Sequence, residues 1–195
     1  CPPNSTCNTD GFICDAAGSA CYPDRLFELS LTGFLNSKVA QYLLTIFNPT
    51  LNYQAGNIAN LPFEHTSFSD SVVHKAISIS KLDWDSRETS WDFKKSPLLN
   101  AASSLSDSYG HWQKDVTVDF FQLHENEEEL NRIFIDIYGL QDELTPDVPL
   151  KDITILQEEL DRKNLDELEP VFRAEGKDAI ELPINRKEEI GRAHV

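Results

Sequence analysis

Apolar residues recur at helical spacing in the first third of the chain. Between Ser30 and Asn48 they fall every three or four positions, which is typical of one buried face of a helix. The residues of this stripe are Leu31, Leu35, Val39, Leu43 and Phe47. Ser30 is a suitable N-cap, and Pro49 cannot continue a helix. The pattern therefore predicts one helix over 31–47.

A second and longer seam predicts a helix over 100–138, about 58 Å long at ~1.5 Å per residue. Gly139 follows the last apolar position and is a natural C-cap. So long an apolar seam needs a covering helix, which we expect from 71–95 or 155–169. The apolar positions of the seam are Leu105, Tyr109, Trp112, Val116, Phe120, Leu123, Leu130, Ile133, Phe134, Ile137 and Tyr138.

Short apolar runs beside glycine turns predict strands over 10–23 and 57–63, and a weaker one over 179–184. The predicted fold class is α+β and mainly helical, with a small strand-helix unit followed by long spacer helices. The expected divisions are 1–64 (the small strand-helix unit), 65–145 (a helical stretch), 146–188 (an acidic extension) and 189–195. The last seven residues resemble a translated sequencing adapter and are expected to be a non-native tail.

Composition indicates a folded piece of a longer protein. Apolar residues make up 40% of the chain, enough for a core. The chain starts at Cys1 and contains no methionine, so we expect a fragment. No apolar run approaches the roughly 18 residues of a membrane helix. All four cysteines fall within 1–21 without the close pairing of zinc ligands, which favours reduced thiols in the cytoplasm. A secreted disulfide-bonded domain remains an alternative.

The net charge of −16 is concentrated near the end of the chain. Residues 122–195 carry nine basic and twenty acidic side chains, or −11, whereas residues 1–64 carry only −3. Because phosphate binding requires clustered Lys and Arg, the last third is a poor candidate for DNA contact.

Catalytic and metal-binding motifs are missing. There is no glycine-rich phosphate loop and no nucleophile elbow. The spacing of His65 and His74 does not favour a metal site, and the acidic run 125–129 lacks the spacing of a calcium loop. The string Asn48-Pro49-Thr50-Leu51 lacks the second proline and the aromatic residue of the adenine methyltransferase motif. We therefore expect no catalytic residue and no metal in this chain.

Five local strings are distinctive: LTGFLNSKVA (31–40), NPTLNYQAGNI (48–58), DWDSRETSWDF (83–93), EELNRIFIDIYGL (128–140) and DELTP (142–146). Together they resemble the PglX-type adenine-specific DNA methyltransferases of BREX phage-defence systems. The resemblance implies that 1–64 is the end of a target-recognition-like unit and that 65–145 is a helical spacer. The resemblance implies a large enzyme whose missing methylase domain binds S-adenosylmethionine and methylates a flipped adenine. Implied partners are DNA, through the parent enzyme, and other phage-defence proteins.

Five polar residues of the first strings are candidates for DNA contact, because amide and ammonium groups can bind base edges. They are Asn36, Lys38, Asn52, Gln54 and Asn57. The alternative is that they are ordinary surface or turn residues. The alternative for the whole chain is an acidic helical adaptor that binds proteins and has no enzymatic parent.

Overall fold

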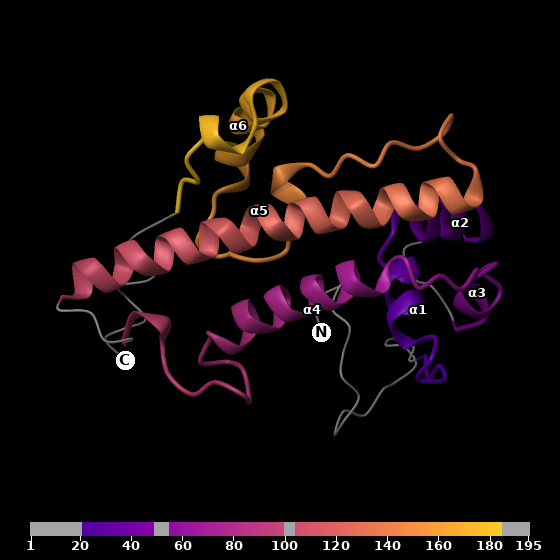
Figure 1. Ribbon diagram of the computed structural model, residues 1–195, viewed down its shortest axis with the longest axis horizontal. Helices are drawn as coiled ribbons and strands as arrows, with labels where there is room; N and C mark the ends of the chain where they lie inside the picture. Colours follow the sequence, from indigo (N-terminus) through magenta and orange to yellow (C-terminus); the bar gives the residue numbers. More distant parts are fainter. Residues whose placement is uncertain (1–20, 49–54, 100–103, 185–195) are drawn as a thin grey trace. The chain divides into compact units, whose positions relative to one another are not determined.

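The computed structural model describes residues 21–48, 55–99 and 104–184, and they form helices joined by loops (Figure 1). Six α-helices are present in these ranges: α1 (Glu28–Leu35), α2 (Lys38–Phe47), α3 (Ala55–Ala59), α4 (Asp70–Asp85), α5 (Leu105–Tyr138) and α6 (Arg162–Glu175). Three short 3-10 helices complete them: η1 (Pro97–Leu99), η2 (Leu150–Asp152) and η3 (Lys177–Ala179). None of the helices in these ranges is long and apolar enough to cross a membrane.

The α+β fold class was wrong. No strand forms in the described residues, and their one β-bridge joins Leu160 to Ile184. The expected strand over 57–63 is instead the end of α3 and a turn, with Asn60 N–H donating to Gly56 O at 3.2 Å. A short apolar run without a neighbouring strand cannot satisfy its backbone groups as a sheet does, so local helical bonds prevail. Most of the expected 10–23 strand pair lies outside the described residues.

The chain divides into two compact units, each made of separate stretches of sequence. Unit 1 comprises 1–75 with 126–147, and unit 2 comprises 76–125 with 148–195. Helices α4 and α5 therefore contribute residues to both. The domain boundaries expected from the sequence remain a prediction.

The core of unit 1 is built around Phe34 of α1, which is fully buried. Its ring stacks on Tyr138 at 5.6 Å and meets Phe134 edge-on at 5.6 Å. Gly33 provides the space for this packing, because a Cβ there would lie 2.7 Å from Val73 Cγ2. The first family string thus packs α1 directly against the last turns of α5.

The single helix expected over 31–47 is broken at Asn36 and Ser37. Asn36 is the C-cap of α1 and Ser37 is the N-cap of α2, where its side chain accepts a hydrogen bond from Ala40 N–H. The break changes which face is buried. Val39 is fully buried as expected, but Phe34 and Ala40 are buried too, whereas Phe47 is half exposed. Two adjacent capping residues thus outweighed a continuous apolar stripe.

The long second helix was predicted correctly. Helix α5 runs unbroken for 34 residues, about 51 Å at ~1.5 Å per residue. It ends at Gly139, whose φ is +65°. Bonds from Gly139 N–H to Asp136 O and from Leu140 N–H to Ile135 O complete a Schellman cap.

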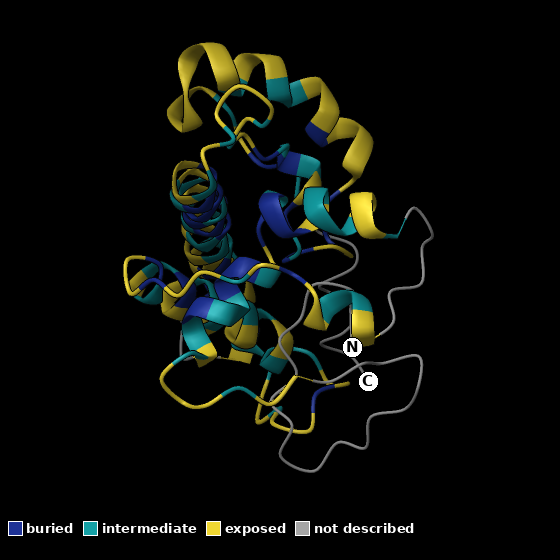
Figure 2. Cartoon of the chain, turned by 90° about the vertical axis from the view of Figure 1, so that its right-hand side faces the viewer, coloured by how far each residue is buried: buried dark blue, intermediate teal, exposed yellow. Residues whose placement is uncertain are grey.

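Unit 2 has its own apolar core, formed by α4, α5 and the loop and helix that follow. Phe120, Leu123 and Leu150 are its most completely buried large hydrophobic side chains. Helix α6 covers this core through Leu165 and is otherwise mostly exposed, as its largely yellow surface at the top of Figure 2 shows.

Candidate functional site

Lys38 and the loop 145–147 meet in unit 1 around Asn131, which is only 4% exposed. Its Oδ1 accepts a hydrogen bond from Lys38 N–H at 2.9 Å, at the start of α2. Its Nδ2 donates to Pro146 O at 3.2 Å. The Asn131 side chain thus provides hydrogen-bond partners for a backbone N–H in the first turn of α2 and for a carbonyl of the 145–147 loop. We call Lys38, Asn131 and the 145–147 carbonyls the Asn131 cluster.

The ammonium group of Lys38 completes this cluster. Its Nζ donates to Thr145 O at 3.2 Å and to Asp147 O. Three successive carbonyls of the 145–147 loop therefore receive a side-chain donor. Such a loop, with a proline at 146, has no neighbouring strand to supply backbone partners, so these side chains replace them. The cluster can therefore hold the loop in place.

Two of the five DNA-contact candidates lie close together, and one lies apart. Asn36 and Lys38 flank the break between α1 and α2, where Asn36 Nδ2 donates to Thr32 O at 2.8 Å. Asn57 lies beyond the other end of α2, with its Oδ1 3.4 Å from Asn48 Nδ2. The ten residues of α2 separate these places by about 15 Å. Asn52 and Gln54 lie outside the described residues, and the DNA-contact role of all five stays a prediction.

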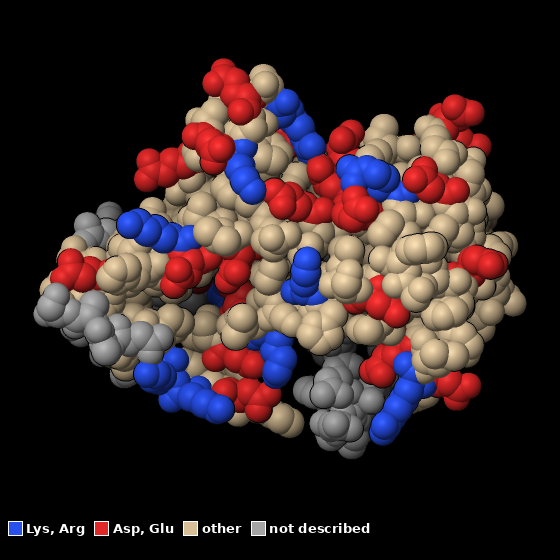
Figure 3. Space-filling model, viewed as in Figure 1, with Lys and Arg blue, Asp and Glu red and all other residues tan. Residues whose placement is uncertain are grey.

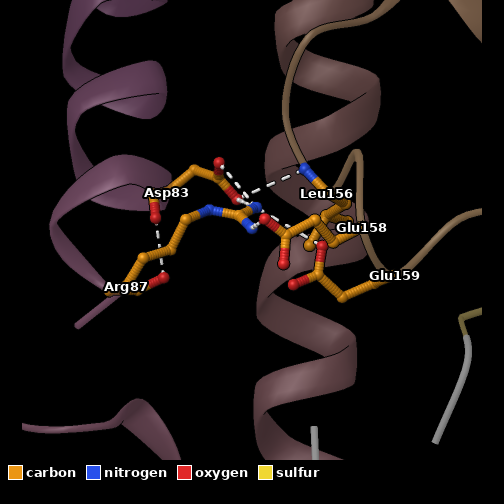
Figure 4. Close-up of polar contacts among 6 residues, drawn as sticks. Asp83, Arg87, Leu156, Glu158 and Glu159 are labelled. Carbon is orange, nitrogen blue, oxygen red and sulfur yellow. Dashed lines mark hydrogen bonds and ion pairs between the residues drawn. The ribbon is translucent and has the colours of Figure 1, made fainter. Parts of the chain in front are cut away.

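A second polar cluster, which the sequence analysis missed, lies in unit 2 around Arg87 (Figure 4). Its guanidinium group contacts Asp83 Oδ2 at 3.1 Å and Glu159 Oε2 at 3.3 Å. Asp83 Oδ1 also accepts from Leu156 N–H at 3.3 Å. We call Asp83, Arg87, Glu158 and Glu159 the Arg87 cluster.

Burial gives the Arg87 cluster its electrostatic character. The side chains of Arg87, Asp83 and Glu159 are 12%, 16% and 2% exposed, whereas that of Glu158, 3.6 Å from the guanidinium, is 62% exposed. Burial raises the pKa of Asp83 above its ordinary value, and the charge of Glu159 raises it further. The attraction of Arg87 and the bond from Leu156 only partly oppose this rise. Two enclosed carboxylates thus share one cation.

The Arg87 cluster holds a backbone in an uncommon conformation. Leu156 has a φ of +55°, which costs a residue with a Cβ about 1–3 kcal/mol. Its buried side chain and its bond to Asp83 maintain this conformation. The i, i+4 spacing of Asp83 and Arg87 is the one signal in the sequence that could have indicated an ion pair. Nothing in the sequence indicates that Glu159, which lies 72 residues after Arg87, contacts this pair.

The structure brings together no metal-binding group in the residues it describes, that is, no set of three His, Cys, Asp or Glu suitably placed. Of the histidines considered from the sequence, His65 meets the ring of Phe27 edge-on at 5.0 Å. His124 is buried, with its Nε2 2.7 Å from Val148 O. His65 is thus packed against an aromatic ring, and His124 is buried with a hydrogen-bond partner.

Two curated proteins are similar to most of this chain. The adenine-specific methyltransferase PglX of Lacticaseibacillus casei (strain Zhang) is 38% identical over 161 residues, which cover 78% of this chain and 13% of that protein. The adenine-specific methyltransferase BrxX of Escherichia coli O9:H4 (strain HS) is 33% identical over 138 residues, which cover 69% and 12%. No family model matches the sequence. The chain thus spans about an eighth of the length of these relatives.

Proposed function

Because this chain is homologous to a stretch of the PglX-type adenine-specific methyltransferases, we propose that it is a non-catalytic helical spacer within such an enzyme. The function follows from what the strings shared with this family do in the fold. Their polar residues make intrachain bonds that hold helices and loops in place.

The observation that carries this proposal is how the side chains of Lys38, Asn131 and Arg87 are bonded. Each lies in a family string, and each has its polar side chain bonded to a distant part of its own unit. A reaction centre would instead direct such groups into a cleft where a substrate could reach them. The strings therefore fit a role in folding and in spacing other parts of the enzyme.

The charge of the chain supports a spacer more than a DNA-binding surface. Acidic side chains gather on α6, at the top of the face drawn in Figure 3. Those of the helix and its cap are Asp161, Asp166, Glu167, Glu169 and Glu175. The same helix carries Arg162, Lys163 and Arg173, so its net charge with the cap is −2, which still disfavours contact with phosphates.

The rest of the enzyme would supply the chemistry. We propose that its methylase domain binds S-adenosylmethionine and methylates adenine, as part of a phage-defence system of the BREX type. DNA would then bind through the parent enzyme, and other proteins of the defence system are candidate partners. This chain itself is expected to bind no cofactor.

A contribution to target recognition is the second candidate. The exposure of Asn36, next to the break between two helices, favours it. In the intact methyltransferase, Asn36→Ala should then change which sites are methylated without changing the unfolding temperature. Unchanged site preference would leave the spacer role as the whole function.

The chain alone provides the first test of the spacer role. Incubation with labelled S-adenosylmethionine and an adenine-containing duplex should give no incorporation above background. Incorporation would contradict the proposal.

The intact methyltransferase provides the second test. Asn131→Ala should lower the yield of folded enzyme and its methylation rate together, while the KM for S-adenosylmethionine stays unchanged. Gly110→Ala, at an open position of α5, is the matched control and should leave both unchanged. A changed KM after Asn131→Ala would place this segment in the cofactor site and overturn the spacer role.

A further inference from the structure

The segment that follows α4 displays an indole to solvent. Trp91 is 85% exposed, the highest value among the large hydrophobic side chains of the described residues. It lies in the family string 83–93, outside the Arg87 cluster that the same string helps to build. Exposing so large an apolar ring is unfavourable in water, so its position calls for a physical account.

Both neighbours of Trp91 are bonded to α4. Ser90 Oγ donates to Asp85 Oδ1 at 2.8 Å, and Ser90 is itself only 8% exposed. Asp92 accepts from Lys81 Nζ at 3.0 Å, and Lys81 also pairs with Asp85 at 2.9 Å. Asp92 N–H also donates to Ser90 Oγ at 3.1 Å, so the buried serine orders the turn around the indole, whereas the exposed Lys81 pairs contribute little. Because the turn is already ordered, less conformational entropy would be lost when Trp91 binds a ligand.

Two basic side chains follow Trp91 in the sequence. Lys94 and Lys95 are adjacent, exposed, and three and four residues beyond the indole. The acidic neighbours Asp85 and Asp92 are paired with Lys81, and Glu88 is the other exposed carboxylate of the loop. The loop thus offers an aromatic ring and two ammonium groups on a chain of net charge −16.

We propose that Trp91, Lys94 and Lys95 form a contact point for an unpaired nucleic-acid strand. The indole would stack on a base, and the ammonium groups would neutralise adjacent phosphates, which is how strands are bound without sequence preference. A duplex would not fit, because its bases are already stacked and its many phosphates would meet the acidic surface of the chain. The inference goes beyond the spacer role and does not depend on it.

Fluorescence anisotropy of the complete 195-residue chain tests the proposal. The probe is a labelled oligothymidylate of about 15 nucleotides in about 50 mM salt, a length that suits single-strand sites. We expect saturable binding that Trp91→Ala weakens about 5- to 100-fold, the range for loss of one stacked base. Lys94→Gln with Lys95→Gln should reduce the salt slope by about 1.4, since each phosphate contact contributes about 0.7. Glu88→Gln should strengthen binding.

Two matched controls separate this site from general attraction. Trp84→Phe alters an indole that is 47% exposed on α4, and Arg162→Gln with Lys163→Gln removes an adjacent exposed basic pair on α6. Both should bind as the parent chain does, and circular dichroism should show all variants folded.

The proposal would be overturned by the absence of saturable binding, by unchanged affinity after Trp91→Ala, or by an equal loss of affinity in the α6 control. A protein surface would then be the better partner for the indole. Equal affinity for a duplex of the same length would also overturn it.

Discussion

Asn131 connects three separate parts of unit 1 through one amide group. Asn131→Ala leaves both Lys38 N–H and Pro146 O without this partner at a partly buried position. Each unsatisfied group costs about 1–3 kcal/mol, so we expect the free energy of unfolding to fall by about 2–4 kcal/mol. Lys38→Met, which removes only the more exposed ammonium bonds, should cost less. Urea denaturation followed by circular dichroism measures both, and equal effects would contradict this account.

Arg87 has a comparable role in unit 2, with a larger electrostatic consequence. Arg87→Met would leave Asp83 and Glu159 enclosed without a cation. Breaking a buried ion pair costs about 3–5 kcal/mol, and the partial exposure of the cluster reduces this to about 2–4 kcal/mol. Replacing Arg132, whose pair with Glu129 is exposed on α5, should change stability little. A similar loss of unfolding free energy in the Arg87 and Arg132 variants would show that burial does not determine how much these ion pairs stabilise the fold.

Asp83 gives the Arg87 cluster a defined pH dependence. Its folded pKa lies above the ordinary value, so its ionisation costs stability at neutral pH. This cost is fully present above the folded pKa and disappears as the pH falls towards the unfolded value of about 3.9. Asp83→Asn keeps an acceptor for Leu156 but cannot ionise. The stability of the parent chain relative to Asp83→Asn should therefore rise as the pH is lowered, and a fall would contradict the raised pKa.

At the scale of elements, replacing either of two helical glycines by alanine should have opposite effects on stability. A Cβ added at Gly33 of α1 would lie 2.7 Å from Val73 Cγ2 and 3.0 Å from Leu130 Cδ1. A Cβ added at Gly110 of α5 would have no such atom within 4 Å. Gly33→Ala should thus lower stability by about 1–3 kcal/mol through overpacking. Gly110→Ala should raise it by about 0.5–1 kcal/mol through helix propensity. Thermal unfolding distinguishes them, and stabilisation by both would mean that the α1 contact adapts freely.

At the scale of the molecule, the acidic balance limits binding to duplex DNA. With a net charge of −16, the chain can neutralise few phosphates. We expect dissociation constants weaker than about 1 μM for any duplex at physiological salt, measured by gel shift or anisotropy. Nanomolar affinity, which is typical of complete specific binders, would show that the chain carries a recognition surface of its own.

The position of a helix could be predicted from the sequence where a long apolar period ended at a clear capping residue. The α5 seam and its cap at Gly139 were found because a long apolar period ended at a residue suited to positive φ. The 57–63 strand was wrong because a run of seven residues fits a strand or a helical turn equally well. The α1–α2 break was missed because the apolar stripe continues on both sides of Asn36 and Ser37, although both residue types also cap helices.

The sequence by itself determined the main helices, the acidic charge and, through the strings, the relationship to adenine-specific methyltransferases. Only the tertiary structure decided what the polar residues of those strings do. Lys38 bonds Asn131 across 93 positions, and Arg87 bonds Glu159 across 72. Periodicity reports which face of a local element is apolar, whereas a buried polar group takes whichever partner the folded chain brings within reach.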